Sequence, residues 1–234
     1  MTRIYRLWMA CCLLLVVVGV AQGGGMPAPF PLIKGASWTY RGQLKWTTTA
    51  HSVRQAAITW TMEVTDVVHR TPYAAAVIRG FLTDLAWAEP KTPRSDSLLL
   101  WDSNARYYLL QGDAVPRILK RLRDQHDRLE GLVDASQQLF AFPLACGQRF
   151  GDPALVARPD GWYCWSVEDQ GTVALDGITG VRKGEYPSFR LAFRTNPDHQ
   201  VLQFVPGVGF SAYSYVHHGT VAEAEFKLVA THGI

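Results

Sequence analysis

Residues 38–47 read WTYRGQLKWT, and this stretch decides the fold class. Its apolar side chains recur at even positions and would share one face, which carries Trp38, Tyr40, Leu44 and Trp46. The odd positions between them are polar or charged. Because successive side chains of a β-strand point to opposite faces, this alternation predicts a strand with one buried and one solvated face.

The same period of two returns along the chain. Residues 58–65 (ITWTMEVT), 188–194 (SFRLAFR) and 223–229 (EAEFKLV) each alternate apolar and polar side chains. Turn-forming residues separate such runs, for example at 102–104 (DSN) and at 206–209 (PGVG). Many short strands with turns at this spacing predict a mainly β fold, an antiparallel curved sheet or partly open barrel.

One segment departs from this pattern, residues 113–131 (DAVPRILKRLRDQHDRLEG). Apolar residues recur there at helical spacing, namely Val115, Ile118, Leu119, Leu122 and Leu129. Asp113 is placed to cap the start of a helix, and Gly131 is placed to end it. We therefore expect one amphipathic helix over about 113–131, packed on the sheet with its charged face in solvent.

The first 21 residues predict a secretory signal peptide. Arg3 and Arg6 precede an apolar run from Leu7 to Ala21, and small residues close that run. Its 15 residues fall short of the roughly 20 that a membrane span needs. We expect cleavage after Ala21, a flexible leader over 22–29 and a secreted or periplasmic location. An uncleaved N-terminal anchor is the alternative.

The mature chain is almost neutral. Removal of the signal peptide leaves 21 basic and 20 acidic residues, a net charge of about +1. The sequence has no basic stripe with interleaved aromatic residues, so nucleic acid is not an expected partner. After cleavage no segment is expected to span a membrane.

The pattern F-P-L-x-x-G occurs twice, starting at Phe30 and at Phe142. Proline favours an extended residue before it, and the glycine permits a turn that other residues resist. We interpret the echo as a repeated way of starting a strand. Residues 30–234 are expected to form a single β-rich domain, in which 30–135 and 140–234 are candidate pseudo-repeat halves.

Two cysteines, Cys146 and Cys164, follow the predicted signal peptide. Cysteines of an exported protein usually pair, because the compartments outside the cytoplasm are oxidising. A disulfide between them would close a short loop, worth about 3 kcal/mol in the chain-entropy view. We predict this disulfide; free thiols are the alternative.

The sequence has none of the common catalytic or metal-binding motifs. It lacks G-x-S-x-G, H-E-x-x-H, C-x-x-C and a glycine-rich phosphate loop, so no catalytic residue, metal or cofactor is predicted. His217 and His218 are adjacent, and neighbouring strand residues point to opposite faces, so they cannot easily chelate one ion together. His217 instead shares a face with Tyr213 and Tyr215.

Aromatic residues carry the main functional signal. Seven tryptophans follow the signal peptide, and such side chains either pack a core or line an apolar ligand cavity. The candidate ligand-binding residues are Trp46, Trp60, Trp101, Tyr213, Tyr215 and His217.

Three motifs of the chain resemble those of a class of uncharacterised exported bacterial β-proteins. They are F-P-L-x-x-G-x-x-W-x-Y at Phe30 to Tyr40, Y-C-W-x-V-E at Tyr163 to Glu168, and P-G-V-G at Pro206 to Gly209 followed by Tyr213. The resemblance implies an antiparallel β fold outside the cytoplasm and carries no catalytic residue. A looser likeness is to periplasmic lipoprotein carriers, in which a curved sheet closes over an apolar cavity, although their N-terminal lipobox is absent here.

These observations favour an exported, non-catalytic protein that binds an apolar small molecule, a lipid or an envelope component. The first alternative is a structural or interaction protein of the cell envelope without a small ligand. The second alternative is an envelope hydrolase, whose catalytic residues would have to converge from distant positions.

Overall fold

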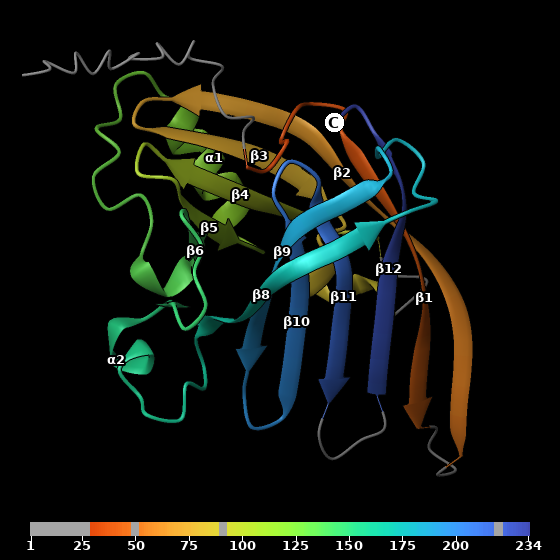
Figure 1. Cartoon of the computed structure of the whole chain (residues 1–234). Helices are drawn as coiled ribbons and strands as arrows, with labels where there is room; N and C mark the ends of the chain where they lie inside the picture. Colours follow the sequence, from red (N-terminus) through yellow and green to blue (C-terminus); the bar gives the residue numbers. More distant parts are fainter. Residues whose placement is uncertain (1–28, 48–51, 89–92, 218–221) are drawn as a thin grey trace, which may run out of the picture.

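The computed structural model describes residues 29–47, 52–88, 93–217 and 222–234. The predicted signal peptide and the leader up to residue 28 lie outside the described residues. Twelve strands form one antiparallel sheet in the order β6-β5-β4-β3-β2-β1-β12-β11-β10-β9-β8-β7 (Figure 1). The sheet curls into a nearly closed barrel with one unsealed seam, between its end strands β6 and β7. The predicted mainly β, antiparallel fold is confirmed.

The sheet strands and the short helices have the following bounds. The strands are β1 (Ser37–Thr47), β2 (Val53–Arg70), β3 (Tyr73–Arg79), β4 (Asp96–Asp102), β5 (Arg106–Leu110), β6 (Gln138–Ala141), β7 (Arg149–Phe150), β8 (Trp165–Leu175), β9 (Gly184–Arg194), β10 (Asp198–Val205), β11 (Gly209–His217) and β12 (Ala222–His232). The helices are η1 (Leu82–Asp84), η2 (Ala86–Ala88), α1 (Ala114–Arg123), η3 (Ala135–Gln137) and α2 (Pro153–Val156).

Aromatic rings fill one part of the barrel interior. Phe30 is fully buried and meets Trp38, Phe204 and Phe210 edge-on, with ring centroids 5.1–5.6 Å apart. Phe140 extends the cluster through Phe204 at 5.3 Å. Trp38, Phe140, Phe204 and Phe210 come from β1, β6, β10 and β11, and Phe30 comes from the segment before β1. Trp38 points inward, as the alternation in β1 predicts.

The two F-P-L-x-x-G motifs make matching backbone contacts. The Gly35 and Gly147 amides each donate a 2.8 Å hydrogen bond to a valine carbonyl, of Val64 and Val167 respectively. Each valine amide in turn donates a 2.9 Å bond to the residue after the glycine. Both glycines have φ near +87° (87° and 88°), a left-handed conformation that favours glycine. The motif thus starts β1 beside β2 and β7 beside β8, while the pseudo-repeat halves stay a prediction.

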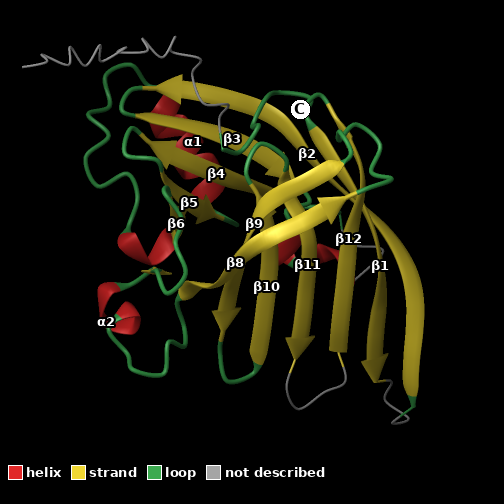
Figure 2. Cartoon of the chain, viewed as in Figure 1, coloured by secondary structure: helices red, strands yellow, loops and turns green. Residues whose placement is uncertain are grey.

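Residues 81–88 enter the barrel and are called the plug from here on. Phe81 and Leu82 are fully buried, and Trp87 is 4% exposed. The Trp87 indole Nε1 donates a 2.8 Å hydrogen bond to the Leu82 carbonyl, which folds the plug on itself. Figure 2 shows the short plug helices behind strands β11 and β12. This segment was not predicted from the sequence.

Helix α1 covers the outer face of β3, β4 and β5 through buried Val115, Ile118 and Leu122. The predicted extent of 113–131 was too long, because the helix ends at Arg123. Asp124 is extended, with ψ at 109°, and the Asp113 side chain forms no capping hydrogen bond. In the described part of the chain, no helix has the length and apolar character needed to cross a membrane.

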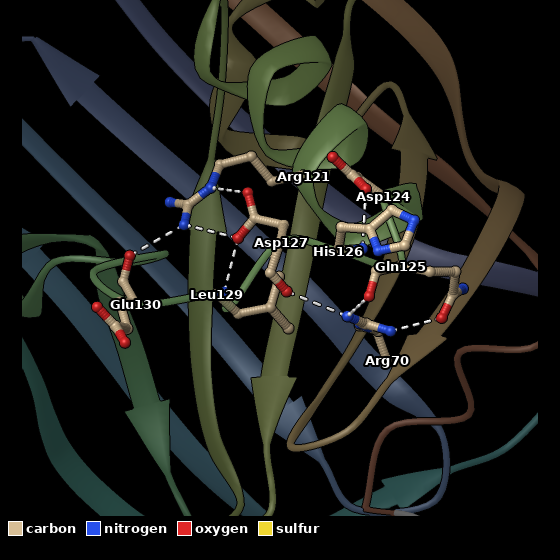
Figure 3. Close-up of polar contacts among 8 residues, drawn as sticks. All are labelled: Arg70, Arg121, Asp124, Gln125, His126, Asp127, Leu129 and Glu130. Atoms are coloured by element: carbon tan, nitrogen blue, oxygen red, sulfur yellow. Dashed lines mark hydrogen bonds and ion pairs between the residues drawn. The ribbon is translucent and has the colours of Figure 1, made fainter.

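One ion pair and several hydrogen bonds hold the segment that follows α1. Arg121 makes two hydrogen bonds to the Asp127 carboxylate, at 2.8 and 3.0 Å (Figure 3). Arg70 of β2 donates to the carbonyl oxygens of Gln125 and Asp127, at 2.8 and 3.1 Å. Leu129 remains buried here with φ at 59°, so its apolar pattern reflects a packed turn and not a longer helix.

The predicted disulfide between Cys146 and Cys164 is wrong, since both thiols are free. The antiparallel register of β7 and β8 pairs Phe150 with Trp165 and so sets Cys164 opposite Gly151, five residues beyond Cys146. The Cys146 thiol instead donates a 3.4 Å hydrogen bond to the Glu168 carbonyl, and Glu168 lies four residues beyond Cys164, about 13 Å along an extended strand. A disulfide requires Cα atoms within about 7 Å of each other, so this register prevents the pairing.

Candidate functional site

An apolar pocket of about 730 Å³ lies inside the barrel next to the plug. Its lining comes from the β1–β2 hairpin, from β11 and β12, and from the plug. The lining side chains include Leu44, Trp46, Ala56, Ile58, Trp60, Leu85, Trp87, Tyr215 and Ala222. Aliphatic and aromatic groups therefore dominate the walls of the pocket.

Strand pairing explains why space is left at this place. Leu44 is flanked by Ala56 on β2 and by Ala224 on β12, and Trp46 has Ala222 as its β12 neighbour. Leu44 thus stands between two alanines, and Trp46 stands beside one, with Arg54 as its neighbour on β2. Because alanine fills little volume, the inner face of these strands is hollow there.

The plug closes one side of the pocket. Trp87 meets Tyr215 and Phe226 at ring centroid distances of 5.7 and 5.4 Å. Trp60 donates a 2.8 Å hydrogen bond from Nε1 to the Gly80 carbonyl, at the point where the chain turns into the plug. Both indole N–H groups are thus satisfied by backbone carbonyls, and their apolar faces remain for the pocket.

The pocket is open at Trp46, whose side chain is 39% exposed. On the same rim, Lys45 Nζ pairs with the carboxylate of Glu223 at 3.2 Å. The two charges neutralise each other, so the rim presents no net charge from this pair.

A polar cluster adjoins the pocket where β10 begins and β11 ends. The register places Asp198 opposite His217 and Gln200 opposite Tyr215. The Tyr215 hydroxyl donates a 2.6 Å hydrogen bond to Asp198 Oδ1, and His217 Nδ1 lies 2.7 Å from the same oxygen. Burial and the bond to Asp198 raise the pKa of Tyr215, so its hydroxyl stays protonated as a donor.

The structure brings together part of the predicted set. Trp46, Trp60 and Tyr215 line the pocket. Tyr213 is 2% exposed and stands behind it, 6.2 Å from Trp87 between ring centroids. His217 belongs to the polar cluster.

Trp101 lies apart from the other predicted residues. It is on β4 and stacks on Tyr107 at 6.1 Å. The pocket also uses Leu85 and Trp87, which were not selected from the sequence. Trp87 is one of the seven tryptophans noted in the sequence. The residues around it do not alternate between apolar and polar, so the sequence did not predict that its side chain points into the barrel.

The described residues contain no group of three or more His, Cys, Asp or Glu side chains able to hold a metal ion. Burial raises the pKa of Asp84 in the plug, but its oxygens already accept hydrogen bonds from the Ala86 amide and the Ser95 hydroxyl, both at 2.9 Å. Asp198 Oδ1 likewise lies in hydrogen-bond contact with Tyr215 and His217.

A second hollow, of about 450 Å³, lies on the outer face of β8 to β12. The row of paired residues that crosses it runs from Asp169 through Arg190 and Gln203 to Ala212 and Lys227. It carries charges of both signs and differs in character from the apolar pocket inside the barrel.

No family model and no curated protein matches the chain. Among solved structures, the chain is similar to a candidate exported protein of Bacteroides fragilis with a YmcC-like fold, at 11% identity and a TM-score of 0.40, over 88% of this chain and 100% of that one. It is similar to a candidate lipoprotein of Parabacteroides distasonis at 11% identity and a TM-score of 0.36, over 88% of this chain and 99% of that one.

Proposed function

We propose that this chain is an exported, non-catalytic binding protein that holds an apolar small molecule or a lipid chain in the barrel pocket. The observation that carries the proposal is the pocket of about 730 Å³ with aromatic and aliphatic walls. Ligand pockets of proteins typically measure about 300–1,000 Å³ and are mostly apolar with a few polar groups.

Packing supports this use of the space. Protein interiors are normally filled to the density of organic crystals, because an unfilled apolar void forfeits dispersion contacts. Elsewhere in this barrel that rule holds, as Phe30 and its neighbours show. An apolar guest between Trp46 and Trp87 would restore the missing contacts.

The polar cluster next to the pocket suits a guest with a polar end. Tyr215 contributes its ring to the pocket, while its hydroxyl points to Asp198. An amphiphile would place its chain against the ring and its polar group near His217 and Asp198. Export is proposed from the signal-peptide pattern of residues 1–21.

A cavity-filling variant tests the proposal. Ala56 points into the pocket, whereas Gln55 next to it is exposed on the opposite face and bonds Gln43. Binding is measured with a fluorescent apolar probe, N-phenyl-1-naphthylamine, and by competition with a fatty acid. Ala56→Trp is expected to weaken probe binding about tenfold or more, which corresponds to about 1.4 kcal/mol. Gln55→Trp is expected to leave it unchanged.

Native mass spectrometry of protein purified from its own host provides the second readout. A co-purifying apolar molecule that is lost in Ala56→Trp is the expected result. Equal probe affinities in Ala56→Trp and Gln55→Trp, with no co-purifying molecule in either, would refute a ligand role for the pocket.

A further inference from the structure

Strand β2 is much longer than the strand on its outer side. It has 18 residues, Val53–Arg70, but β3 pairs with it only from Glu63 onward. Residues 53–61 of β2 pair with β1 on one side. On the other side, where β3 pairs with the later part of β2, no strand in the described part of the chain lies next to residues 53–61. Figure 1 shows this part of β2 at the right-hand border of the sheet.

Two contacts show which backbone groups of β2 point toward β1 and which point outward. The carbonyl and amide of Val64 bond to Gly35 and Ala36 just before β1, so the backbone groups of this even-numbered residue point toward β1. The carbonyl of odd-numbered Thr61 instead accepts a 2.8 Å hydrogen bond from Arg94 Nη1. In a strand, the N–H and C=O of one residue point to the same side, and the side alternates with each residue. The outward-pointing groups therefore belong to the odd residues, including Gln55, Ala57 and Thr59.

This border has few of the features that usually keep sheet edges apart. Natural edges are protected by lysine, proline, bulges or inward-pointing charges. Residues 53–61 (VRQAAITWT) contain neither lysine nor proline, and their one charged residue is Arg54, which shares the face of Ala56 and Ile58. The pairing with β1 runs without a register shift, so no bulge interrupts the segment.

We propose that residues 55–59 of β2 pair with the same residues of a second copy of this chain. Antiparallel pairing about a two-fold axis at Ala57, the midpoint of the segment, sets Gln55 opposite Thr59 of the second copy. The outward-pointing backbone groups of Gln55, Ala57 and Thr59 then each face another one, while the Thr61 carbonyl keeps its bond to Arg94. A two-fold contact of this kind is self-complementary and closes on itself.

Side chains fit the same arrangement. Antiparallel pairing about Ala57 puts Ala56 opposite Ile58 and Arg54 opposite Trp60 of the second copy, so no like charges meet. Ala56 and Ile58 line the pocket in each copy, and they remain on the same face of the joined sheet. The two pockets would therefore lie side by side across the axis. This pairing does not depend on a ligand.

A proline substitution at Ala57 tests the pairing. Proline lacks an N–H, and at position 57 the lost N–H points to the open border and not to β1, so the strand itself is preserved. Wild type and Ala57→Ser are expected to be dimers by light scattering after size-exclusion chromatography. Ala57→Pro is expected to be a monomer with an unchanged circular dichroism spectrum. A monomeric wild type, or a dimeric, folded Ala57→Pro, would overturn the proposal.

Cross-linking checks the register and does not rely on the proline variant. With Cys146 replaced by serine, because that thiol is exposed, Ala57→Cys and Gln55→Cys are treated with a short bismaleimide. In the Ala57→Cys dimer the two introduced thiols lie directly across the axis, whereas in the Gln55→Cys dimer they are displaced by four residues, about 13 Å. Efficient cross-linking of Ala57→Cys and little of Gln55→Cys is expected. The reverse, or cross-linking of neither variant, contradicts the pairing, as does capture of an unrelated extended peptide by a monomeric chain.

Discussion

The Trp38 indole donates a 2.6 Å hydrogen bond from Nε1 to the carbonyl oxygen of Val208, 170 residues farther along the chain. The Gly207 amide donates a 2.9 Å bond to the Pro29 carbonyl beside it. The F-P-L start and the P-G-V-G turn, found separately in the sequence, thus form one packed unit. Its aromatic members are buried, so its role in the fold is structural.

Two glycines of that turn should differ in their tolerance to alanine. Gly209 has φ at +108°, and a Cβ there would lie 2.9 Å from both Phe30 and Trp38. Gly207 has φ at +80°, but a Cβ would meet nothing within 4 Å. Backbone strain alone costs about 1–2 kcal/mol, and overpacking adds about 1–3 kcal/mol. Urea unfolding should show Gly209→Ala at about 3 kcal/mol or more of destabilisation and Gly207→Ala at about half that or less.

Tyr40 should make stability depend on alkaline pH. Its hydroxyl is fully buried and donates a 3.0 Å hydrogen bond to the Phe210 carbonyl, and burial raises its pKa well above the usual value. The pKa of a tyrosine in the unfolded chain is about 10. The stability that neutral Tyr40 contributes is therefore complete below about pH 10 and is lost as the pH rises above it.

The Tyr40→Phe variant separates the contribution of the Tyr40 hydrogen bond at neutral pH from the effect of Tyr40 ionisation at alkaline pH. It removes a buried hydrogen bond to the Phe210 carbonyl, so we expect a loss of about 0.5–1.5 kcal/mol at neutral pH. Above about pH 10 its stability should fall less steeply than that of the wild type. Denaturant melts between neutral and alkaline pH measure both; parallel pH curves for the two proteins would contradict the expectation.

The two thiols should react at different stages of unfolding. Cys146 is exposed, whereas Cys164 is buried and its burial raises its pKa. Iodoacetamide should therefore modify one cysteine of the folded mature protein and both in denaturant without reductant. The intact mass distinguishes the cases, and a protein that stays unmodified under non-reducing denaturing conditions would indicate a disulfide after all.

Asp127 should contribute stability that is lost in acid. Its hydrogen bonds with Arg121 hold the pKa of the carboxyl below the usual value. That contribution is complete above the unfolded pKa of about 3.9 and disappears as the pH falls through the lower folded value. Asp127→Asn should lower the melting temperature at pH 7, and the gap should close in strong acid. Asp113→Asn is the control, because the Asp113 side chain caps nothing.

Local patterns predicted much of the fold. The inward faces of β1, β9 and β12 follow from alternation over fewer than a dozen residues, and Trp38, Leu191 and Phe226 are buried as expected. The helix was predicted at its true start but extended too far, because Leu129 continues the apolar spacing in a turn that Arg121 and Asp127 hold. A side-chain network of this kind leaves no periodic signal.

The candidate site was predicted only in part. Trp46 and Tyr215 were selected as aromatic residues on inward faces, and they meet at the pocket. Trp87 was not selected, because the plug is neither a strand nor an amphipathic helix. The disulfide was wrong because the number and spacing of cysteines do not reveal the register between β7 and β8.

The sequence by itself determined which segments become strands and which of their faces are apolar, since a two-residue period is a property of neighbouring residues. Only the tertiary structure decided which strands become neighbours. Lys45 and Glu223, 178 residues apart, meet because β1 pairs with β12 and joins the two ends of the described chain. The pocket depends on such long-range pairing, because its volume arises where large side chains of one strand face alanines of another.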